Sequence, residues 1–411
     1  MGWKVSEVVE QRFRFVEDYN AQTWTVAELC RHYGISRPTA YKWLERYQST
    51  GLEGLKDHSR APLHHPQAVS AEVQQLLLAV KSQHPFWGAR KLLAHLAAQA
   101  PKQHWPAQST VGEFLKQQGL TVARRSRPHS PAANQPLVHA DAPNRVWSID
   151  FKGWFKTGDG QICYPLTVTD NYSRMLLRCQ VLPAETTVLV QPVLAAAFRE
   201  YGLPERIRSD NGTPFGSNGH SGLSALSVWW LKLGIVPERI DPGCPQQNGR
   251  HERMHLTLKL ETALPPQPTL RKQQQRFDAF RQEYNQQRPH EALGQTPPAA
   301  SYQLSPQPYP SRVPETHYDP AWRTHRIASG GMFRLNSAHT IFVSHVLEGE
   351  RIGLEPLDER FSRAWFESYE LGIVDHAEGR LYNPQIWQQR KAREARRDQR
   401  RAESHAKEAN P

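Results

Sequence analysis

The chain has 411 residues, 38% of them hydrophobic, and this length predicts two to four folded domains rather than one core. Its net charge is +11, and the basic excess lies mainly in residues 1–140, which favours a polyanionic partner without fixing a fold. The four cysteines form no C-x-x-C pair, and neither a secretory signal nor an apolar run of ~20 residues is visible, so we exclude a disulfide scaffold and a membrane protein and expect a cytoplasmic one.

The first 50 residues have the pattern of a DNA-binding helix-turn-helix. Apolar spacing predicts a helix over residues 5–20, then helix, tight turn and helix over residues 25–47. Gly34 permits a left-handed turn, and Ser36 is expected to cap the second helix. A plain three-helix bundle with solvated charges would share this pattern. In the DNA-binding interpretation, the side chains that project from the recognition helix are Arg37, Thr39, Lys42 and Arg46.

A second helical unit is predicted over residues 70–125. Ser70 is expected to cap a helix that ends near residue 83, a second helix starts near residue 87, and Ser109 is expected to cap a third. The pattern fits a second helix-turn-helix and fits equally well a small bundle without a DNA role. The leucines expected to form its core are Leu76, Leu92, Leu96 and Leu115.

Segments rich in proline and basic residues divide the chain. Arg124 and Arg125 stand where the second unit meets one of them and are candidate DNA contacts. The last segment is a charged tail for which DNA binding and simple solvation are equally open. We expect basic linkers at 51–69 and 126–143, a Pro-rich linker at 301–322 and a basic tail at 384–411.

Residues 144–300 change to strand-like patterns. Three strands over residues 145–182, the first two joined by a Gly-Asp-Gly turn, are followed by alternating helices and strands. This is the order of an RNase H-like fold. After residue 323, several short strand patterns predict a small β-barrel over residues 323–383.

Three carboxylates in this region carry the strongest chemical signal. Asp150 and Asp210 each end a strand pattern, and Glu252 lies in the first turn of a predicted helix. Any one of them alone is more often structural than catalytic, but together they are a ligand set for two Mg²⁺ ions, which Mn²⁺ can replace. Asp170, on an adjoining strand, is interpreted as structural.

The helix of Glu252 holds two further signals. Spacing of three and four residues places Glu252, His255 and Lys259 on one face, so Lys259 is a candidate contact to the DNA backbone, with a plain surface lysine as the even alternative. His251, Glu252 and His255 also match H-E-x-x-H, the signature of zinc metalloproteases. That interpretation leaves both aspartates unexplained and lacks a third ligand.

These motifs resemble an IS481-type insertion-sequence transposase, within the retroviral-integrase-like recombinases that use an Asp, Asp, Glu triad. The 41 residues between Asp210 and Glu252 exceed the usual spacing of that group, and the excess is expected in the loop at residues 216–222. The resemblance rests on Ser209-Asp210-Asn211-Gly212, Pro245-Gln246-Gln247-Asn248-Gly249, Glu252-Arg253, Thr257-Leu258-Lys259, Tyr284-Asn285, Arg288-Pro289-His290, Ala292-Leu293 and Thr296-Pro297.

The resemblance implies a multidomain α/β protein with N-terminal helix-turn-helix units, an RNase H-like α/β catalytic core and a small C-terminal β-barrel. It further implies a polynucleotidyl transferase that binds terminal inverted repeats, assembles as a homo-oligomer on double-stranded DNA, and cleaves and joins strands with Mg²⁺. Asp150, Asp210 and Glu252 would be both the catalytic residues and the metal ligands. A bacterial cytoplasmic location, at the nucleoid when DNA is bound, follows from the same resemblance. A catalytically silent DNA-binding regulator is the alternative, with the zinc metalloprotease more distant.

Overall fold

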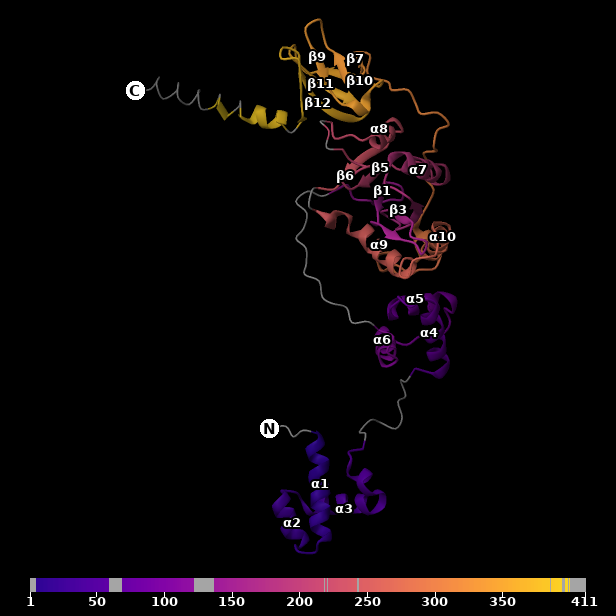
Figure 1. Cartoon of the computed structure of the whole chain (residues 1–411), viewed down its shortest axis with the longest axis vertical. Helices are drawn as coiled ribbons and strands as arrows, with labels where there is room; N and C mark the ends of the chain where they lie inside the picture. The colour runs from indigo at the N-terminus through magenta and orange to yellow at the C-terminus, as the bar shows by residue number, and fades with distance from the viewer. Residues whose placement is uncertain are drawn as a thin grey trace, which may run out of the picture. The chain divides into compact units, whose positions relative to one another are not determined.

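The computed structural model describes residues 5–58, 69–121, 137–241 without 218 and 220, and 244–399 without 385, 394, 395 and 398. Contacts divide the chain into two units, residues 1–69 and residues 70–411, which are described separately (Figure 1). Among the described helices, none combines the length and the apolar character needed to span a bilayer.

The first unit is a compact helical domain around one apolar core. Gly34 has a φ of +63° and Ser36 Oγ accepts a hydrogen bond from the Thr39 N–H, so the predicted turn and cap are confirmed. Leu55, inside the segment expected to be a linker, is fully buried in this core. The elements are α1 (Val5–Asn20), α2 (Val26–Tyr33), α3 (Arg37–Thr50) and the 3₁₀ helix η1 (Gly51–Leu55).

The second unit begins with three short helices, α4 (Ala71–Gln83), α5 (Ala89–Gln99) and α6 (Gln108–Gln117). Ser70 caps α4 as expected, but the residue at the N-cap of α6 is Ala107, so the prediction for Ser109 is wrong. Leu76 is also wrong as a core residue: it is 41% exposed, whereas the adjacent Leu77 is fully buried. A leucine pair at neighbouring positions can satisfy the apolar period with either member, and packing against α5 selects the second.

A mixed sheet forms the centre of the second unit. Strand β1 pairs antiparallel with β3 and parallel with β5, β5 pairs parallel with β6, and β4 and β2 pair with β3. The predicted run of three strands followed by alternating helices and strands is confirmed, with the first strands paired antiparallel and the later ones parallel. The strands are β1 (Val146–Phe151), β2 (Phe155–Lys156), β3 (Ile162–Asp170), β4 (Leu176–Leu182), β5 (Arg206–Ser209) and β6 (Val236–Arg239).

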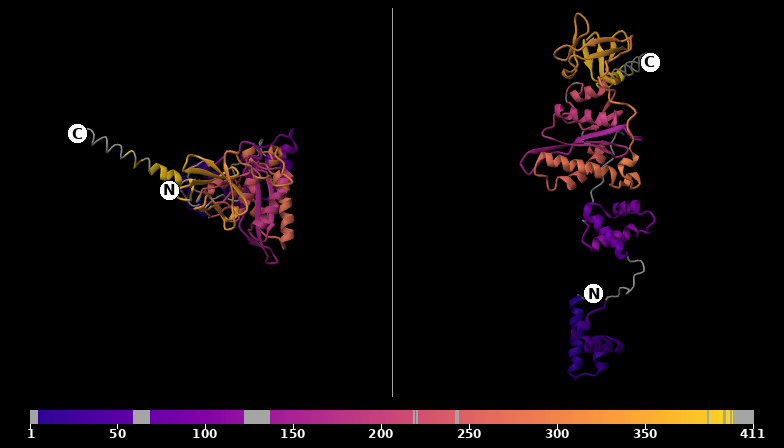
Figure 2. Two further views of the ribbon diagram at one scale, coloured as in Figure 1. Left: turned by 90° about the horizontal axis from the view of Figure 1, so that it is seen from above. Right: turned by 90° about the vertical axis from the view of Figure 1, so that its right-hand side faces the viewer.

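Helices cover both faces of this sheet (Figures 1 and 2). Helices α7 (Thr187–Tyr201) and α8 (Ala225–Lys232) bury Phe198 and Trp230 against β1 and β5. Helices α9 (Gly249–Thr262) and α10 (Leu270–Gln286) pack on β3 and β4 from the other side. This layered order places the C-terminal ends of β1 and β5 beside the start of α9.

The C-terminal region is a small β-domain whose core includes residues of α8, and the Lys232–Glu350 ion pair at 2.7 Å joins the two. Its strands form a five-stranded antiparallel sheet, β13-β12-β11-β10-β7, and a separate β8-β9 hairpin. Both hydrogen-bonded sheets are open, so the predicted closed barrel is not shown. The strands are β7 (Arg323–Arg326), β8 (Met332–Arg334), β9 (Thr340–Phe342), β10 (Arg351–Pro356), β11 (Phe361–Phe366), β12 (Tyr369–Asp375) and β13 (Arg380–Tyr382).

The Pro-rich segment between the core and the β-domain is held against the core. Tyr302 Oη donates to Asn144 Oδ1 at 2.8 Å, and the Ser305 N–H donates to the Tyr201 carbonyl at 2.9 Å. The first part of this segment is therefore a packed extension of the core rather than a free spacer.

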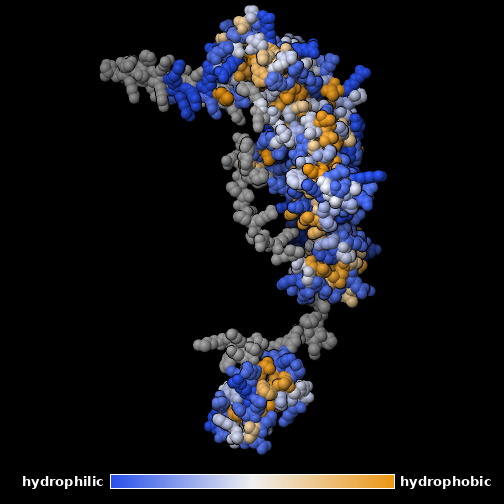
Figure 3. Space-filling view, viewed as in Figure 1, coloured by the Kyte–Doolittle hydropathy of each residue, from blue (hydrophilic) through white to orange (hydrophobic). Residues whose placement is uncertain are grey.

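On the face shown in Figure 3, hydrophilic side chains cover most of the described surface and hydrophobic ones form small groups.

Replacing Leu55 with Ala should unfold the first unit selectively. The loss of a fully buried leucine costs about 2–5 kcal/mol, a large share of the stability of a domain of this size. Differential scanning calorimetry of the full chain should show a lowered transition for the first unit only. Leu52→Ala in the same 3₁₀ helix is the control, because Leu52 is 57% exposed. Equal effects of the two substitutions would contradict the packing of η1.

Candidate active site

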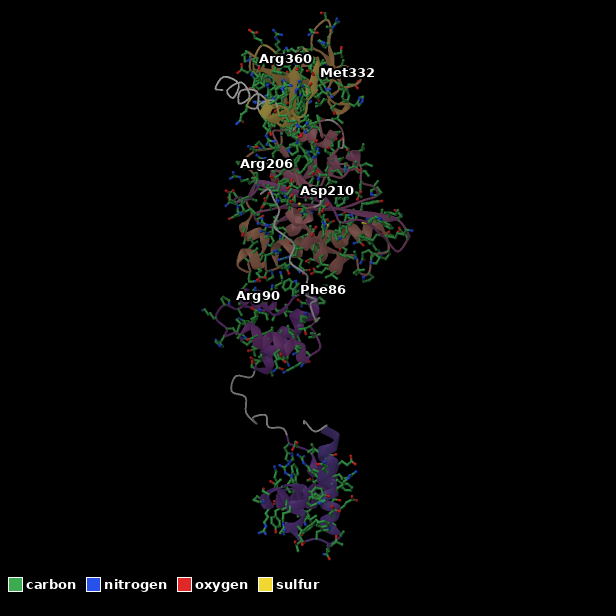
Figure 4. The ribbon with its side chains drawn as sticks, turned by 90° about the vertical axis from the view of Figure 1, so that its left-hand side faces the viewer. Phe86, Arg90, Arg206, Asp210, Met332 and Arg360 are labelled. Atoms are coloured by element: carbon green, nitrogen blue, oxygen red, sulfur yellow. The ribbon has the colours of Figure 1, made fainter. Side chains whose placement is uncertain are left out.

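Two aspartates lie at the C-terminal ends of adjacent parallel strands. Asp150 is the penultimate residue of β1, and Asp210 directly follows β5. Ser148 pairs with Arg208, so the same register continued by two residues brings Asp150 level with Asp210. Asp210, which is labelled in Figure 4, accepts a hydrogen bond at Oδ1 from the Gly212 N–H at 3.2 Å, and this bond orients its carboxylate. The strand order therefore brings together two acids that are distant in sequence.

The third acid, Glu252, lies in the first turn of α9 and is exposed. A negative side chain at this position is favoured by the partial positive charge of a helix N-terminus. Asn248, just before the helix, donates from Nδ2 to Asp150 Oδ2 over a long 3.4 Å. The start of α9 is thereby oriented toward the end of β1.

The electrostatic environment of Asp150 is that of an uncompensated acid. Burial, followed by the negative charges of Asp210 and Glu252, raises the pKa of Asp150 to about 7. Burial also raises the pKa of Asp210. Lys152 opposes the shift at Asp150 only in part. Since each ionised carboxylate disfavours the others, a cation bound among them would be strongly attracted.

Two histidines of α9 form a buried polar cluster behind Asp150. Nε2 of His251 and Nε2 of His255 both lie 2.7 Å from Thr167 Oγ1, and His251 Nδ1 lies 2.9 Å from Thr169 Oγ1. Thr167 Oγ1 in turn donates to the Asp150 carbonyl at 3.1 Å. Burial lowers the pKa of His251 to about 3 and also depresses the pKa of His255, so both rings are neutral at pH 7.

This geometry corrects two expectations. His255 does not share the exposed face of Glu252 and Lys259, because its ring points into the interior toward β3. The zinc-protease interpretation also loses support, since both ring nitrogens of His251 already contact threonine hydroxyls. An H-E-x-x-H site requires a free nitrogen from each histidine.

The cluster of His251, His255 and Thr167 was not assigned a role from the sequence. Asp150, His251 and His255 can nevertheless bring one ligand atom each within 4.8 Å of one another. The sequence feature that could have predicted this cluster is the pair of threonines two residues apart on β3, because this spacing puts two hydroxyls on the same face of a buried strand. Asp170 differs, since its carboxylate accepts hydrogen bonds from the Asn144 N–H and from Ser173, as expected of a structural acid.

The candidate DNA contacts lie in several places. On α3, Arg37 and Lys42 are exposed, whereas Thr39 and Arg46 are partly buried; the Thr39 hydroxyl contacts Ser36 Oγ at 2.8 Å. Lys259 is exposed on α9. Arg124, Arg125, and residues 218 and 220 of the expected insertion loop lie outside the described residues.

Comparisons with protein families agree with this architecture. Models described as "Integrase core domain" match residues 140–245 and 233–298, one described as "Helix-turn-helix domain" matches residues 11–62, and one described as "Homeodomain-like domain" matches residues 39–115. The chain thus carries helix-turn-helix domains ahead of an integrase core domain. These domains imply DNA binding.

Individual relatives come from insertion elements. The chain is 28% identical over 292 residues to an uncharacterized protein of insertion element IS476 from Xanthomonas euvesicatoria, covering 68% of this chain and 80% of the relative. It is 30% identical over 191 residues to an uncharacterized IS407 protein from Burkholderia multivorans, covering 46% and 66%. The chain is therefore homologous to insertion-element proteins.

Solved structures with partial likeness are viral. The simian T-cell lymphotropic virus intasome in complex with the PP2A regulatory subunit B56 gamma is 16% identical, with a TM-score of 0.36, over 71% of this chain and 99% of the viral one. The HTLV-2 integrase catalytic core domain in complex with magnesium is 16% identical, with a TM-score of 0.30, over 40% and 100%.

Replacing Asp150 with Asn should stabilise the metal-free protein. The pKa of Asp150 is higher in the folded state than its ordinary value of 3.8, so its ionisation opposes folding, and stability falls as pH rises from about 4 to 7. At pH 8 the amide should raise the free energy of unfolding by on the order of 1–2 kcal/mol. Urea unfolding in EDTA at pH 5 and pH 8 measures this, and a gain equal at both pH values would contradict it.

Proposed function

We propose that this chain is a DNA transposase that binds the terminal inverted repeats of its own element and catalyses metal-dependent strand cleavage and strand transfer. The observation that carries the proposal is the mutual repulsion of Asp150, Asp210 and Glu252 inside an integrase core domain. Two acids whose charges raise the pKa of a third, opposed only in part by Lys152, form a site for a divalent cation rather than a structural ion-pair network.

The donor set fits Mg²⁺, because all three ligands are carboxylate oxygens and Mg²⁺ is a hard cation. Asp150, Asp210 and Glu252 would hold two such ions, with Mn²⁺ as a substitute. Ions held there would activate an attacking oxygen, from water or from a DNA 3′-hydroxyl, and would stabilise the leaving oxygen. The chain's own contribution is to fix the acids on two strand ends and one helix, which holds their spacing rigid.

The remaining assignments concern DNA. Residues 1–125 would recognise the terminal repeats. The contacts would come from Arg37, Thr39, Lys42 and Arg46 on the recognition helix, and from Arg124 and Arg125 near the linker. Lys259, seven residues beyond Glu252 on α9 and exposed, would neutralise a phosphate close to the acids. Two element ends would be held by a homo-oligomer with one active site per end.

Substituting the acids should abolish chemistry and spare binding. Asp150→Ala, Asp210→Ala and Glu252→Gln each remove a metal ligand, so cleavage and joining of a labelled terminal-repeat duplex in Mg²⁺ should both disappear. Gel-shift affinity for the same duplex should stay within about twofold, because the helix-turn-helix units supply that affinity. Glu205→Gln, an exposed acid outside the site, is the matched control.

Substantial cleavage by any of the three variants would remove that residue from the proposed triad. The same assay separates the second candidate, a catalytically silent DNA-binding regulator. Specific binding without strand transfer by the wild-type chain, in both Mg²⁺ and Mn²⁺, would favour the regulator. The integrity of all three acids is the observation that favours the enzyme.

Removing cations from the recognition helix should weaken end binding. Arg37→Ala combined with Lys42→Ala should lower affinity for the terminal repeat by roughly tenfold or more, and should lessen the dependence of affinity on salt where phosphate contacts are lost. Fluorescence anisotropy at several salt concentrations measures both quantities. Arg14→Ala, on the exposed face of α1, is the control. Unchanged affinity in the double variant would refute the assignment of α3 as the recognition helix.

A further inference from the structure

One ring nitrogen of His255, Nδ1, makes no hydrogen bond among the described residues. Its side chain is 6% exposed, and its Nε2 atom lies 2.7 Å from Thr167 Oγ1. The Nδ1 atom faces Asp150 Oδ2 at 3.8 Å. The residue as a whole is buried, and a ring nitrogen aimed at a carboxylate yet too far away for a direct hydrogen bond leaves room for a partner between the two.

The protonation of this nitrogen follows from Thr167. A threonine hydroxyl has a single proton, and here it is donated to the Asp150 carbonyl. Both histidine Nε2 atoms that contact the same oxygen must therefore donate to it. A buried neutral imidazole protonated at Nε2 carries a lone pair on Nδ1. The Nδ1 lone pair of His255 is thus directed at the oxygen of a carboxylate.

Two lone pairs that face each other at this distance can share a cation. Metal bonds from an imidazole nitrogen and from a carboxylate oxygen are each about 2.1 Å long, so an ion between them spans separations up to about 4.2 Å. The separation of 3.8 Å between His255 Nδ1 and Asp150 Oδ2 lies inside that limit. His251 cannot play this part, because its Nδ1 accepts the proton of Thr169 at 2.9 Å.

We propose that Nδ1 of His255 is a nitrogen ligand to the divalent ion bound by Asp150, so that the site prefers a transition ion such as Mn²⁺ or Co²⁺ to Mg²⁺. The inference rests on the proposed function for the position of the ion and adds a ligand to it. Imidazole nitrogen binds transition ions better than it binds Mg²⁺, which prefers oxygen. Thr167 acts through His255 and is a positioning residue.

The test is a spectroscopic measurement on the full-length chain with Mn²⁺ alone. Electron spin echo modulation of bound Mn²⁺ detects a directly coordinated ¹⁴N nucleus, and the wild-type chain should show it. His255→Gln should lose the coupling, because the glutamine amide can reach the place of Nε2 beside Thr167 but leaves no atom at Nδ1. Mn²⁺ affinity should fall at least about tenfold, with a smaller change for Mg²⁺.

Two further variants make the result specific. His255→Asn puts an amide oxygen near the place of Nδ1, so it should retain more Mn²⁺ affinity than the glutamine variant while losing the nitrogen signal. His251→Gln is the matched control on the same helix and should keep the coupling. Circular dichroism of each variant verifies that the fold is retained.

The outcomes separate this inference from the proposed function. Mn²⁺ binding that survives Asp150→Asn, as well as Asp210→Asn and Glu252→Gln, would overturn the carboxylate site itself, and the histidine ligand with it. Binding that depends on those acids but shows no nitrogen coupling in the wild-type chain would overturn only the role of His255. Loss of the coupling in His251→Gln with the fold retained would also contradict it.

Discussion

The parallel pairing of β1 with β5 is the constraint on which the candidate site depends. It joins two segments about sixty residues apart in register, so that both strands end at one edge of the sheet, each with an aspartate. On the other side of β1, the antiparallel register sets Thr167 directly opposite Asp150. One residue of β1 is thereby placed between a second acid and a buried hydroxyl, and no short-range contact could achieve both. Burial of Trp147 and Ile149 in the same strand keeps this register from slipping, because a shift by one residue would turn them away from the core that they form with α7 and α8.

The rotation of α9 about its axis is fixed by polar contacts with β3 as well as by apolar packing. A buried imidazole must be hydrogen-bonded, and the hydroxyls of Thr167 and Thr169 satisfy three of the four histidine nitrogens. With His251 and His255 turned inward, the residue between them in the first turn, Glu252, is turned toward solvent at the end of β1. The interior cluster and the exposed acid are therefore one arrangement. A helix packed only through leucines could rotate about its axis at little cost. A rotation of α9 would break two directional hydrogen bonds to one hydroxyl.

Much of this fold was predictable from local sequence signals, and the failures have local causes. The caps Ser36 and Ser70 depend on neighbouring residues, so they could be predicted from the sequence pattern. The choice between Leu76 and Leu77 depends on which face meets α5, and the edges of the C-terminal sheets depend on pairing between distant strands, so neither could be predicted. The candidate acids were found because each stands at the end of an element. The inward turn of His255 was missed because helical spacing places it with Glu252, and only hydroxyls on β3, far away in sequence, decide otherwise.

Metal binding and folding are linked at this site because the pKa of Asp150 is raised in the folded chain. Its ionised form is less stable in the folded chain than in the unfolded one, because burial and two neighbouring acids oppose the charge. A cation that binds only the folded state reverses that sign, and by mass action it stabilises the fold in proportion to the logarithm of its concentration. The partial burial that makes the charge of Asp150 costly also limits the water that would compete for a cation. A rigid set of acids that repel one another therefore lowers the stability of the metal-free fold and raises the affinity for the ion. A preorganised metal site exchanges the one for the other.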